Sequence, residues 1–326
     1  MKAKTLLIFL LTLSFIAGAN SISYAREEEY PSKPIQILVA HRAGGGIDLF
    51  FRLLSEELTK SWKVPVNVAN ESGAGGAVGA DRVIKARKDG YSVLGILVAS
   101  ISSMTVAQPG QPISLPRDFD PILTNMGYAA TVYCVRSDSN FKTFKDVINF
   151  AKENPGKLIF GTGVPGGEFF LEWTLLQRAA KVNITTLKLS SAEMIPQLLG
   201  GHIQMCGTSE VAAKPYIDSG RMRGLAVDVK SSAFPNLPTL SEMGYPEDIN
   251  VVSSLTLLGP KGLPPAVLKA WETALQVIVK GSSFNASLKK VGFNNNCETS
   301  PEKIKTILQK ELVKYKQFTP EELGWK

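Results

Sequence analysis

One stretch near the start of the chain constrains the fold more than any other. An apolar run over residues 35–39 leads through His41, Arg42 and Ala43 into three glycines, 44–46, and an amphipathic pattern follows. This order predicts a strand, a glycine loop and a helix. Free backbone N–H groups and the positive end of the helix dipole suit a carboxylate or a phosphate there. A tight turn that needs glycine only for positive φ explains the triplet equally well.

The first 25 residues have the features of a secretory signal peptide. Lys2 and Lys4 precede an apolar run over 6–16, and Ser23-Tyr24-Ala25 is a small-x-small cleavage site. We therefore expect cleavage near Ala25 and a periplasmic mature protein. This segment has no cysteine to carry a lipid, and no later stretch is long enough for a membrane span.

Composition narrows the classes of function. The net charge is +7, and the Lys and Arg residues are scattered without a basic run, which excludes nucleic acid as the expected partner. Cys134, Cys206 and Cys297 allow one disulfide and a thiol, or three thiols. The apolar surroundings of Cys134 and Cys206 favour buried thiols. No cluster of Cys and His indicates a metal.

Strands and helices alternate along the mature chain, which predicts the α/β class with mostly parallel sheets. Strands are expected at 35–39, 64–69, 91–99, 126–135, 158–160, 184–189, 203–206, 225–229 and 251–258. Helices are expected up to about residue 60 and at 80–84, 143–153, 168–181, 191–199, 211–219, 264–281 and 301–316. Residues 100–103 are expected to form a polar loop, and Thr143 a helix cap.

Two further glycine stretches imitate dinucleotide fingerprints. Gly161-x-Gly163-x-x-Gly166 matches GxGxxG literally, and residues 73–79 match a looser spacing. Pro165 interrupts the first, and nucleotide cofactors are not expected outside the cytoplasm. We expect no cofactor, and we interpret these stretches as loops that let backbone N–H groups approach an anion.

The sequence offers little for catalysis. It contains no GxSxG motif, and its two histidines are His41 and His202. Asp48, Glu168 and Glu172 have no spacing that marks an acid/base pair. Asp48 is expected either to cap the following helix or to take a ligand group, and His41 either to touch a ligand or to be a buried imidazole. We therefore predict that the protein is not an enzyme.

Loops rich in Gly, Ser and Thr follow several strands, and they predict a binding cleft for a small carboxylate. The expected ligand-binding residues are Ala43, Gly44, Gly45, Gly46, Asp48, Ser100, Ser102, Thr162, Gly163, Gly166, Gly167, Thr208 and Ser209. Further candidates are His41, Ile47, Phe170 and Lys188.

The whole mature chain resembles the Bug family, the periplasmic substrate-binding proteins of tripartite tricarboxylate transporters. The opening over 33–48 is similar to that family's P-I-x-hydrophobic-VP-FAPGGG-T/S-D motif. The likeness continues, in order, through 70–76, 88–91, 117–119, 154–158, 198–201, 220–227 and 237–244.

The resemblance implies a two-lobed, type II-like periplasmic-binding-protein fold with the ligand cleft between the lobes. Lobe 1 would comprise 26–126 and 250–326, and lobe 2 would comprise 127–249. A carboxylate would be held between the loops at 43–48 and 161–167 and passed by a monomeric receptor to the transporter's membrane subunits. The alternatives are a binding protein that serves a sensor and, from another class, a secreted α/β enzyme acting on an organic acid.

This sequence departs from the family pattern where ligand identity is decided. Ile47 follows the glycine triplet in place of Thr or Ser, and residues 167–170 and 188–190 lack the usual hydroxyls and imidazole. The departures suggest a carboxylate with a more apolar body than citrate-like acids.

Overall fold

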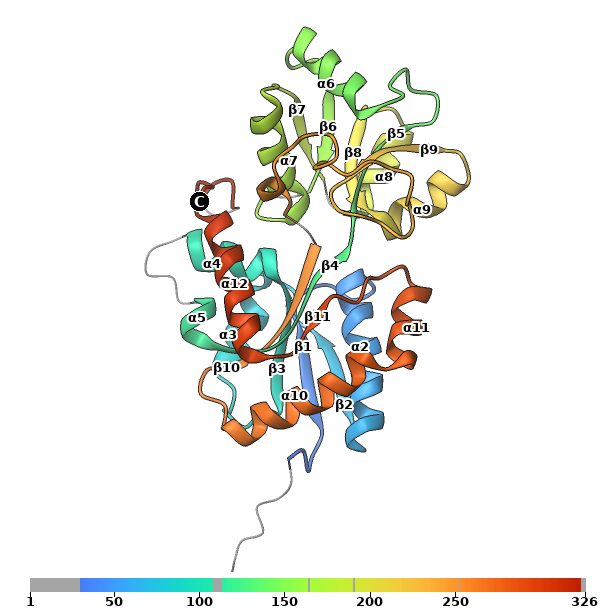
Figure 1. Cartoon of the computed structure of the whole chain (residues 1–326). Helices are drawn as coiled ribbons and strands as arrows, with labels where there is room; N and C mark the ends of the chain where they lie inside the picture. Colours follow the sequence, from blue (N-terminus) through green and yellow to red (C-terminus); the bar gives the residue numbers. More distant parts are fainter. Residues whose placement is uncertain (1–29, 108–112, 164, 190, 252, 324–326) are drawn as a thin grey trace, which may run out of the picture.

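Two lobes lie one above the other in the structure, a computed structural model (Figure 1). It describes residues 30–107, 113–163, 165–189, 191–251 and 253–323, so the expected signal peptide lies outside the described residues. The strands are β1 (Ile35–Val39), β2 (Val66–Asn70), β3 (Ser92–Leu97), β4 (Phe119–Ala129), β5 (Thr131–Arg136), β6 (Ile159–Thr162), β7 (Thr185–Lys188), β8 (Met205–Ser209), β9 (Met222–Val227), β10 (Ser253–Pro260) and β11 (Cys297–Glu298). The helices are α2 (Gly46–Trp62), η1 (Ala74–Gly76), α3 (Ala77–Ile84), α4 (Val98–Ala107), α5 (Leu115–Asp118), α6 (Phe144–Glu153), α7 (Glu168–Ala180), α8 (Ser191–Leu199), α9 (Glu210–Asp218), η2 (Glu247–Ile249), α10 (Pro265–Lys280), α11 (Ser282–Lys290) and α12 (Pro301–Tyr315).

Each lobe is built on one sheet flanked by helices. The first sheet has the order β11-β4-β10-β3-β1-β2, and the second has the order β7-β6-β8-β5-β9. This confirms the expected α/β class. The sheets are mixed and not mostly parallel, because β10 runs antiparallel to β3 and β4, and β5 runs antiparallel to β8 and β9. The strands at which the chain passes between the lobes are β4, β5 and β10.

The chain passes between the two sheets twice. It leaves the first sheet at Ala129 on β4 and enters the second at Thr131 on β5, and it returns into β10 at Ser253. The end of α12 and the tail after it also bridge the lobes, because Tyr315, Phe318 and Leu323 pack into the core of the second lobe. The lobe limits expected from the sequence remain a proposal.

Amphipathic patterns explain where the cores form. The α2 helix buries Phe50, Phe51, Leu54 and Leu58 on one side against the first sheet. In the second lobe, the Phe160 and Trp173 rings stack with centroids 3.5 Å apart and an interplanar angle of 6°. These apolar faces fix the helices to the sheets, whose strand ends carry the glycine loops.

The structure corrects the expected loop at 100–103. These residues lie inside α4, and Ser102 and Ser103 are buried. The segment contains no glycine or proline that would end a helix. The Thr105 hydroxyl also donates to the Ile101 carbonyl one turn earlier at 2.8 Å, so the polar residues of this segment are accommodated within the helix. The expected strand at 126–135 is two strands, and α11 and β11 had not been expected.

The cysteines bear out the interpretation as small buried hydrophobes. Cys134 on β5 and Cys206 on β8 are register partners and fully buried, and all three cysteines are free thiols. Across the described residues, none of the helices is both long and apolar enough to span a membrane.

The expected cap at Thr143 is confirmed and gives a test of local stability. Its hydroxyl accepts from the Asp146 N–H at 3.2 Å, and the Asp146 carboxylate accepts from the Thr143 N–H at 2.8 Å. We expect Thr143→Ala to lower the free energy of unfolding by about 1 kcal/mol in urea titrations, because a helix N–H loses its acceptor. Lys145→Ala, at an exposed position of the same helix, is the control, and an equal loss there would contradict the capping role.

Candidate ligand-binding site

The three glycines between β1 and α2 differ in backbone angle and in surroundings. Gly44 has φ of 84°, which favours glycine. At Gly46, an added Cβ would lie 3.4 Å from both the Tyr128 hydroxyl and Phe293. Gly45 has φ of −87°, and an added Cβ would meet nothing nearer than the Arg42 carbonyl at 3.9 Å. A tight turn therefore explains why glycine stands at position 44 but not why it stands at position 45. The whole loop is exposed.

Asp48 holds this loop in shape. Its side chain is 6% exposed and accepts from the Gly44 N–H at 3.0 Å, from Arg52 at 2.9 Å and from Asn70 at 2.9 Å. Although burial alone would raise the pKa of Asp48, the hydrogen bonds from Arg52, Gly44 and Asn70 hold it below its usual range. The cap of α2 is Gly45 and not Asp48. The geometry favours a positioning role, and direct ligand contact by Asp48 stays a prediction.

The second glycine loop joins β6 to α7 and is fastened to the other lobe. The Gly166 N–H donates to the Glu322 carbonyl at 3.0 Å, and the Ser103 hydroxyl donates to the Gly166 carbonyl at 3.2 Å. Gly166 has φ of 82°, and an added Cβ would lie 2.4 Å from the Leu323 carbonyl oxygen. Gly161 belongs to β6, where an added Cβ would lie 2.4 Å from Ile203, so the first glycine of the apparent fingerprint serves packing.

Several other expected site residues have structural partners. The buried Thr162 hydroxyl donates to the Phe169 carbonyl at 3.0 Å, and Ser209 caps α9 by accepting from the Ala212 N–H at 3.3 Å. Thr208 is buried in β8. Lys188 is exposed, and its ammonium lies 5.9 Å from the centre of the Phe170 ring. Ile47 packs against the core of the first lobe.

Two buried polar atoms near the glycine loops lack a hydrogen-bond partner among the described residues: His41 Nε2 and Ser102 Oγ. Burial lowers the pKa of His41 to about 4, so this imidazole is neutral at neutral pH. Both remain candidates for ligand contact. Ser103, next to Ser102, is the residue that joins α4 to the second glycine loop.

Buried carboxylates hold both crossings between the lobes. Glu210 accepts from the Ala130 N–H at 3.0 Å, and Asp228 accepts from the Thr131 N–H at 2.8 Å. At the return crossing, Glu172 accepts from the Val251 N–H at 3.2 Å and from the Tyr133 hydroxyl at 2.6 Å. Burial raises the pKa of Asp228 to about 7 and that of Glu172 well above its usual range. No sequence spacing could have indicated this set, since its members are far apart in the chain.

Sequence reasoning also missed charged residues at the two glycine loops. Arg42 is exposed directly before the first loop, and Glu168 begins α7 directly after the second. Glu168 had been weighed only as part of an acid/base pair. The signal that could have found both is a charged side chain next to a glycine loop.

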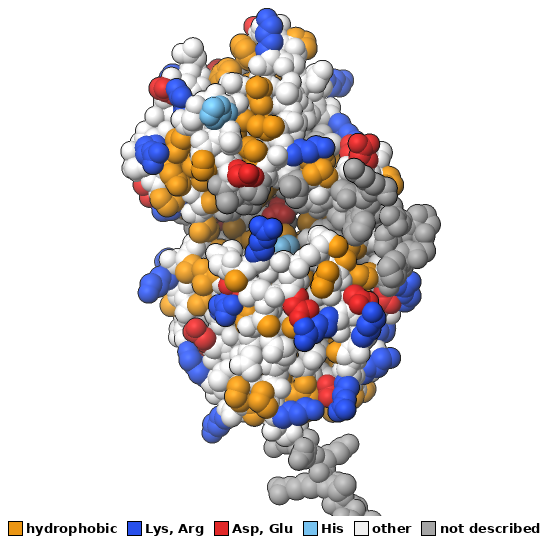
Figure 2. Space-filling view, turned by 180° about the vertical axis from the view of Figure 1, so that it is seen from behind, with side chains coloured by type: hydrophobic (Ala, Val, Ile, Leu, Met, Phe, Trp, Pro, Cys, Tyr) orange, Lys and Arg blue, Asp and Glu red, His pale blue; other side chains and the backbone are white. Residues whose placement is uncertain are grey.

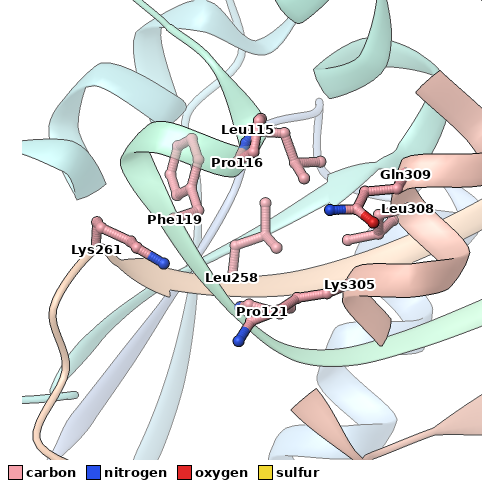
Figure 3. Close-up of a pocket in the computed structure, with 9 residues that line it drawn as sticks. All are labelled: Leu115, Pro116, Phe119, Pro121, Leu258, Lys261, Lys305, Leu308 and Gln309. Atoms are coloured by element: carbon pink, nitrogen blue, oxygen red, sulfur yellow. The ribbon is translucent and has the colours of Figure 1, made fainter. Parts of the chain in front are cut away.

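The surface is hollowed between the two lobes, as Figure 2 shows. Two other cavities lie elsewhere. One, of about 110 Å³, is lined by apolar residues of α5, β4, β10 and α12 together with Lys261, Lys305 and Gln309 (Figure 3). The other, of about 360 Å³, is lined by residues between 228 and 250, including Asp228 and Asn250. Neither includes an expected site residue, and within the described ranges no group of three or more His, Cys, Asp and Glu residues could hold a metal.

Comparison with known proteins decides the family. Residues 50–322 match the tripartite tricarboxylate transporter family receptor. The chain belongs to this receptor family. It is 30% identical over 282 residues to a Cupriavidus necator protein named for the gbd 5′ region, covering 82% of this chain and 80% of that one. It is 30% identical over 261 residues to the protein BugT of Bordetella pertussis, covering 78% of each chain, which confirms the resemblance to the Bug family.

Solved structures of this receptor family have the same fold. The periplasmic binding protein BugD is 26% identical, with a TM-score of 0.72 over 88% of this chain and 97% of that one. A TctC solute-binding protein from Polaromonas is 25% identical, with a TM-score of 0.72 over 88% and 98% of the two chains. The receptor therefore has the two-lobed periplasmic-binding-protein fold expected from the sequence.

The raised pKa of Asp228 makes a prediction about pH. Its carboxyl keeps a proton in the folded state up to about pH 7 but loses it near its ordinary value of 3.8 when unfolded. Folded protein thus binds more protons, so stability falls as the pH rises from about 4 to about 7. We expect Asp228→Asn to make this fall in melting temperature shallower, because the amide cannot ionise and its oxygen still accepts from Thr131.

Asp248→Asn, at an exposed position in η2, is the matched control and should leave the pH profile unchanged. A profile of Asp228→Asn as steep as that of the unsubstituted protein would contradict the assignment.

Proposed function

We propose that this receptor captures a small carboxylate between its lobes and delivers it to the membrane subunits of a tripartite tricarboxylate transporter. The observation that carries the proposal is Gly45. Neither the backbone angle nor packing requires a glycine at this position, which lies at the exposed start of α2. Such a position leaves room for an anion at the backbone N–H groups.

The second glycine loop supplies the opposing surface. Its anchors at Ser103 and Glu322 come from the α4 helix and from the chain after α12, so the loop lies at the contact between the lobes. A ligand held between 43–48 and 161–167 would stabilise a closed arrangement by a hinge at the two crossings.

Relatives of the same fold are consistent with this ligand class. Rpa4515 of R. palustris was solved with adipate, and MatC of Rhodopseudomonas palustris with bound malate. They are 22% and 20% identical to this chain, so their likeness supports the fold, and the carboxylate assignment rests on the family and on the glycine loops.

The finer parts of the proposal follow from the receptor role. The protein acts in the periplasm as a monomer and carries out no chemistry on its ligand. Ile47, Phe169 and Phe170 are half-buried against the cores and stand where the family usually has hydroxyls and an imidazole, so we expect a ligand body less polar than citrate. Service to a sensor in place of a permease is the competing role, and co-purification with transporter membrane subunits distinguishes the two.

Ligand binding should raise the melting temperature. We expect a thermal-shift screen of mono- and dicarboxylates to show stabilisation that grows with concentration, by about 2.7 kcal/mol at a hundred times the dissociation constant. Mass spectrometry of co-purified small molecules supplies candidates. Turnover of an acid with no thermal shift from any of them would overturn the assignment.

Gly45→Leu tests the loop itself. The side chain would project into the space where the anion approaches, so we expect loss of the ligand-induced shift at an unchanged melting temperature without ligand. Ala266→Leu adds similar bulk at an exposed position of α10 and is the control. Full binding by Gly45→Leu would mean that the loop is only a turn.

A further inference from the structure

Glu168 lies where the second lobe meets the crossing strands. It is the first residue of α7, and its carboxylate accepts from the Ser253 hydroxyl at 3.3 Å. Ser253 begins β10 and pairs in register with Ala129 of β4. Glu168 therefore lies over the two strands that join the lobes, directly after the second glycine loop.

The first glycine loop reaches the same place from the other lobe. Tyr128 precedes Ala129 on β4, and its hydroxyl lies 3.4 Å from where a Cβ of Gly46 would be. Burial raises the pKa of Tyr128, and the nearby charge of Glu168 raises it further. Tyr128 thus has Gly46 beside it and adjoins Ala129, the register partner of Ser253, which places the Glu168 carboxylate near the proposed anion cradle.

Glu168 has no basic partner in the part of the chain that is described. None of the ion pairs there includes it, and its nearest ionisable neighbour on α7 is Glu172, another acid. Burial raises the pKa of Glu168 despite the hydrogen bonds from its own N–H and from Ser253. A partly buried carboxylate without a cation is costly, and a cationic ligand group would remove that cost.

Arg42 is its counterpart on the first lobe. The guanidinium is exposed beside the glycine triplet and makes no ion pair with any described residue. Basic, acidic and histidine side chains meet at the hollow between the lobes (Figure 2). Each of the two loops thus brings one unpaired charge, and the two charges are of opposite sign.

We propose that the cleft takes a carboxylate that also carries a protonated amine, with the carboxylate at residues 42–46 and the ammonium at Glu168. This inference rests on the proposed function and specifies its ligand. Glu168 is then a specificity-determining residue. A plain dicarboxylate would place negative charge against Glu168 and be disfavoured.

Matched pairs of acids test the inference on the unsubstituted mature protein. Isothermal titration at neutral pH would compare L-leucine with 4-methylpentanoate, L-phenylalanine with 3-phenylpropanoate, and L-glutamate with glutarate. We expect the amine-bearing member of at least one pair to bind about tenfold more tightly than its partner. Equal or tighter binding by the deaminated members overturns the inference and leaves the proposed function standing. Binding of no carboxylate, with or without an amine, overturns both.

The variant Glu168→Gln tests whether Glu168 is the residue that recognises the ligand's amine. We expect this variant to lose the roughly tenfold advantage of the amine-bearing acid, because the amide carries no charge to pair with the ammonium. Glu153→Gln, at an exposed position of α6, is the matched control and should keep the preference. If Glu168→Gln melts like the unsubstituted protein and still prefers the amine, Glu168 is not the determinant and the inference fails.

Discussion

The arrangement of the two lobes depends on carboxylates that hold backbone N–H groups at the crossings. Where the chain leaves one sheet for the other, Ala130, Thr131 and Val251 donate to Glu210, Asp228 and Glu172. A buried N–H without an acceptor costs about 1–3 kcal/mol, so these side chains replace the acceptors that a continuing sheet would supply. Because no cation neutralises them within the described chain, burial keeps protons on Asp228 and Glu172, and the crossings become sensitive to pH.

Much of the fold could be predicted because its signals are local. The apolar run 35–39, the cap at Thr143 and the glycine loops each act over a few residues, and the structure places a strand, a capping box and strand-to-helix turns there. The mixed strand directions could not be predicted, since the pairing of β10 with β3 and β4 joins segments more than a hundred residues apart. The expectation of a loop at 100–103 was wrong because the burial of its serines in α4 is set by tertiary packing.

The residues of the candidate site likewise divide into those that a local pattern predicts and those that only the fold brings together. The glycine pattern identified both loops, but only the backbone angles and surroundings separate Gly44, Gly46 and Gly45 by physical cause. Asp48 illustrates the limit of a local pattern. A carboxylate two residues after a glycine triplet suggests a cap or a ligand contact, whereas its partners are Gly44, Arg52 and Asn70 of its own lobe. Asn70 ends β2, so this network required the fold.

Closure and ligand choice are linked through the same charges. If the lobes close on a ligand as proposed, water would leave the space between the two glycine loops, and electrostatic interactions there would strengthen. An unpaired Arg42 or Glu168 then becomes more costly, unless the ligand offers a partner for each. Under the proposed assignment, a zwitterion satisfies both charges, whereas a plain acid satisfies one and repels the other. The ligand would thus stabilise the closed arrangement by differential pairing, which is what a receptor needs if only its loaded form is to engage a transporter.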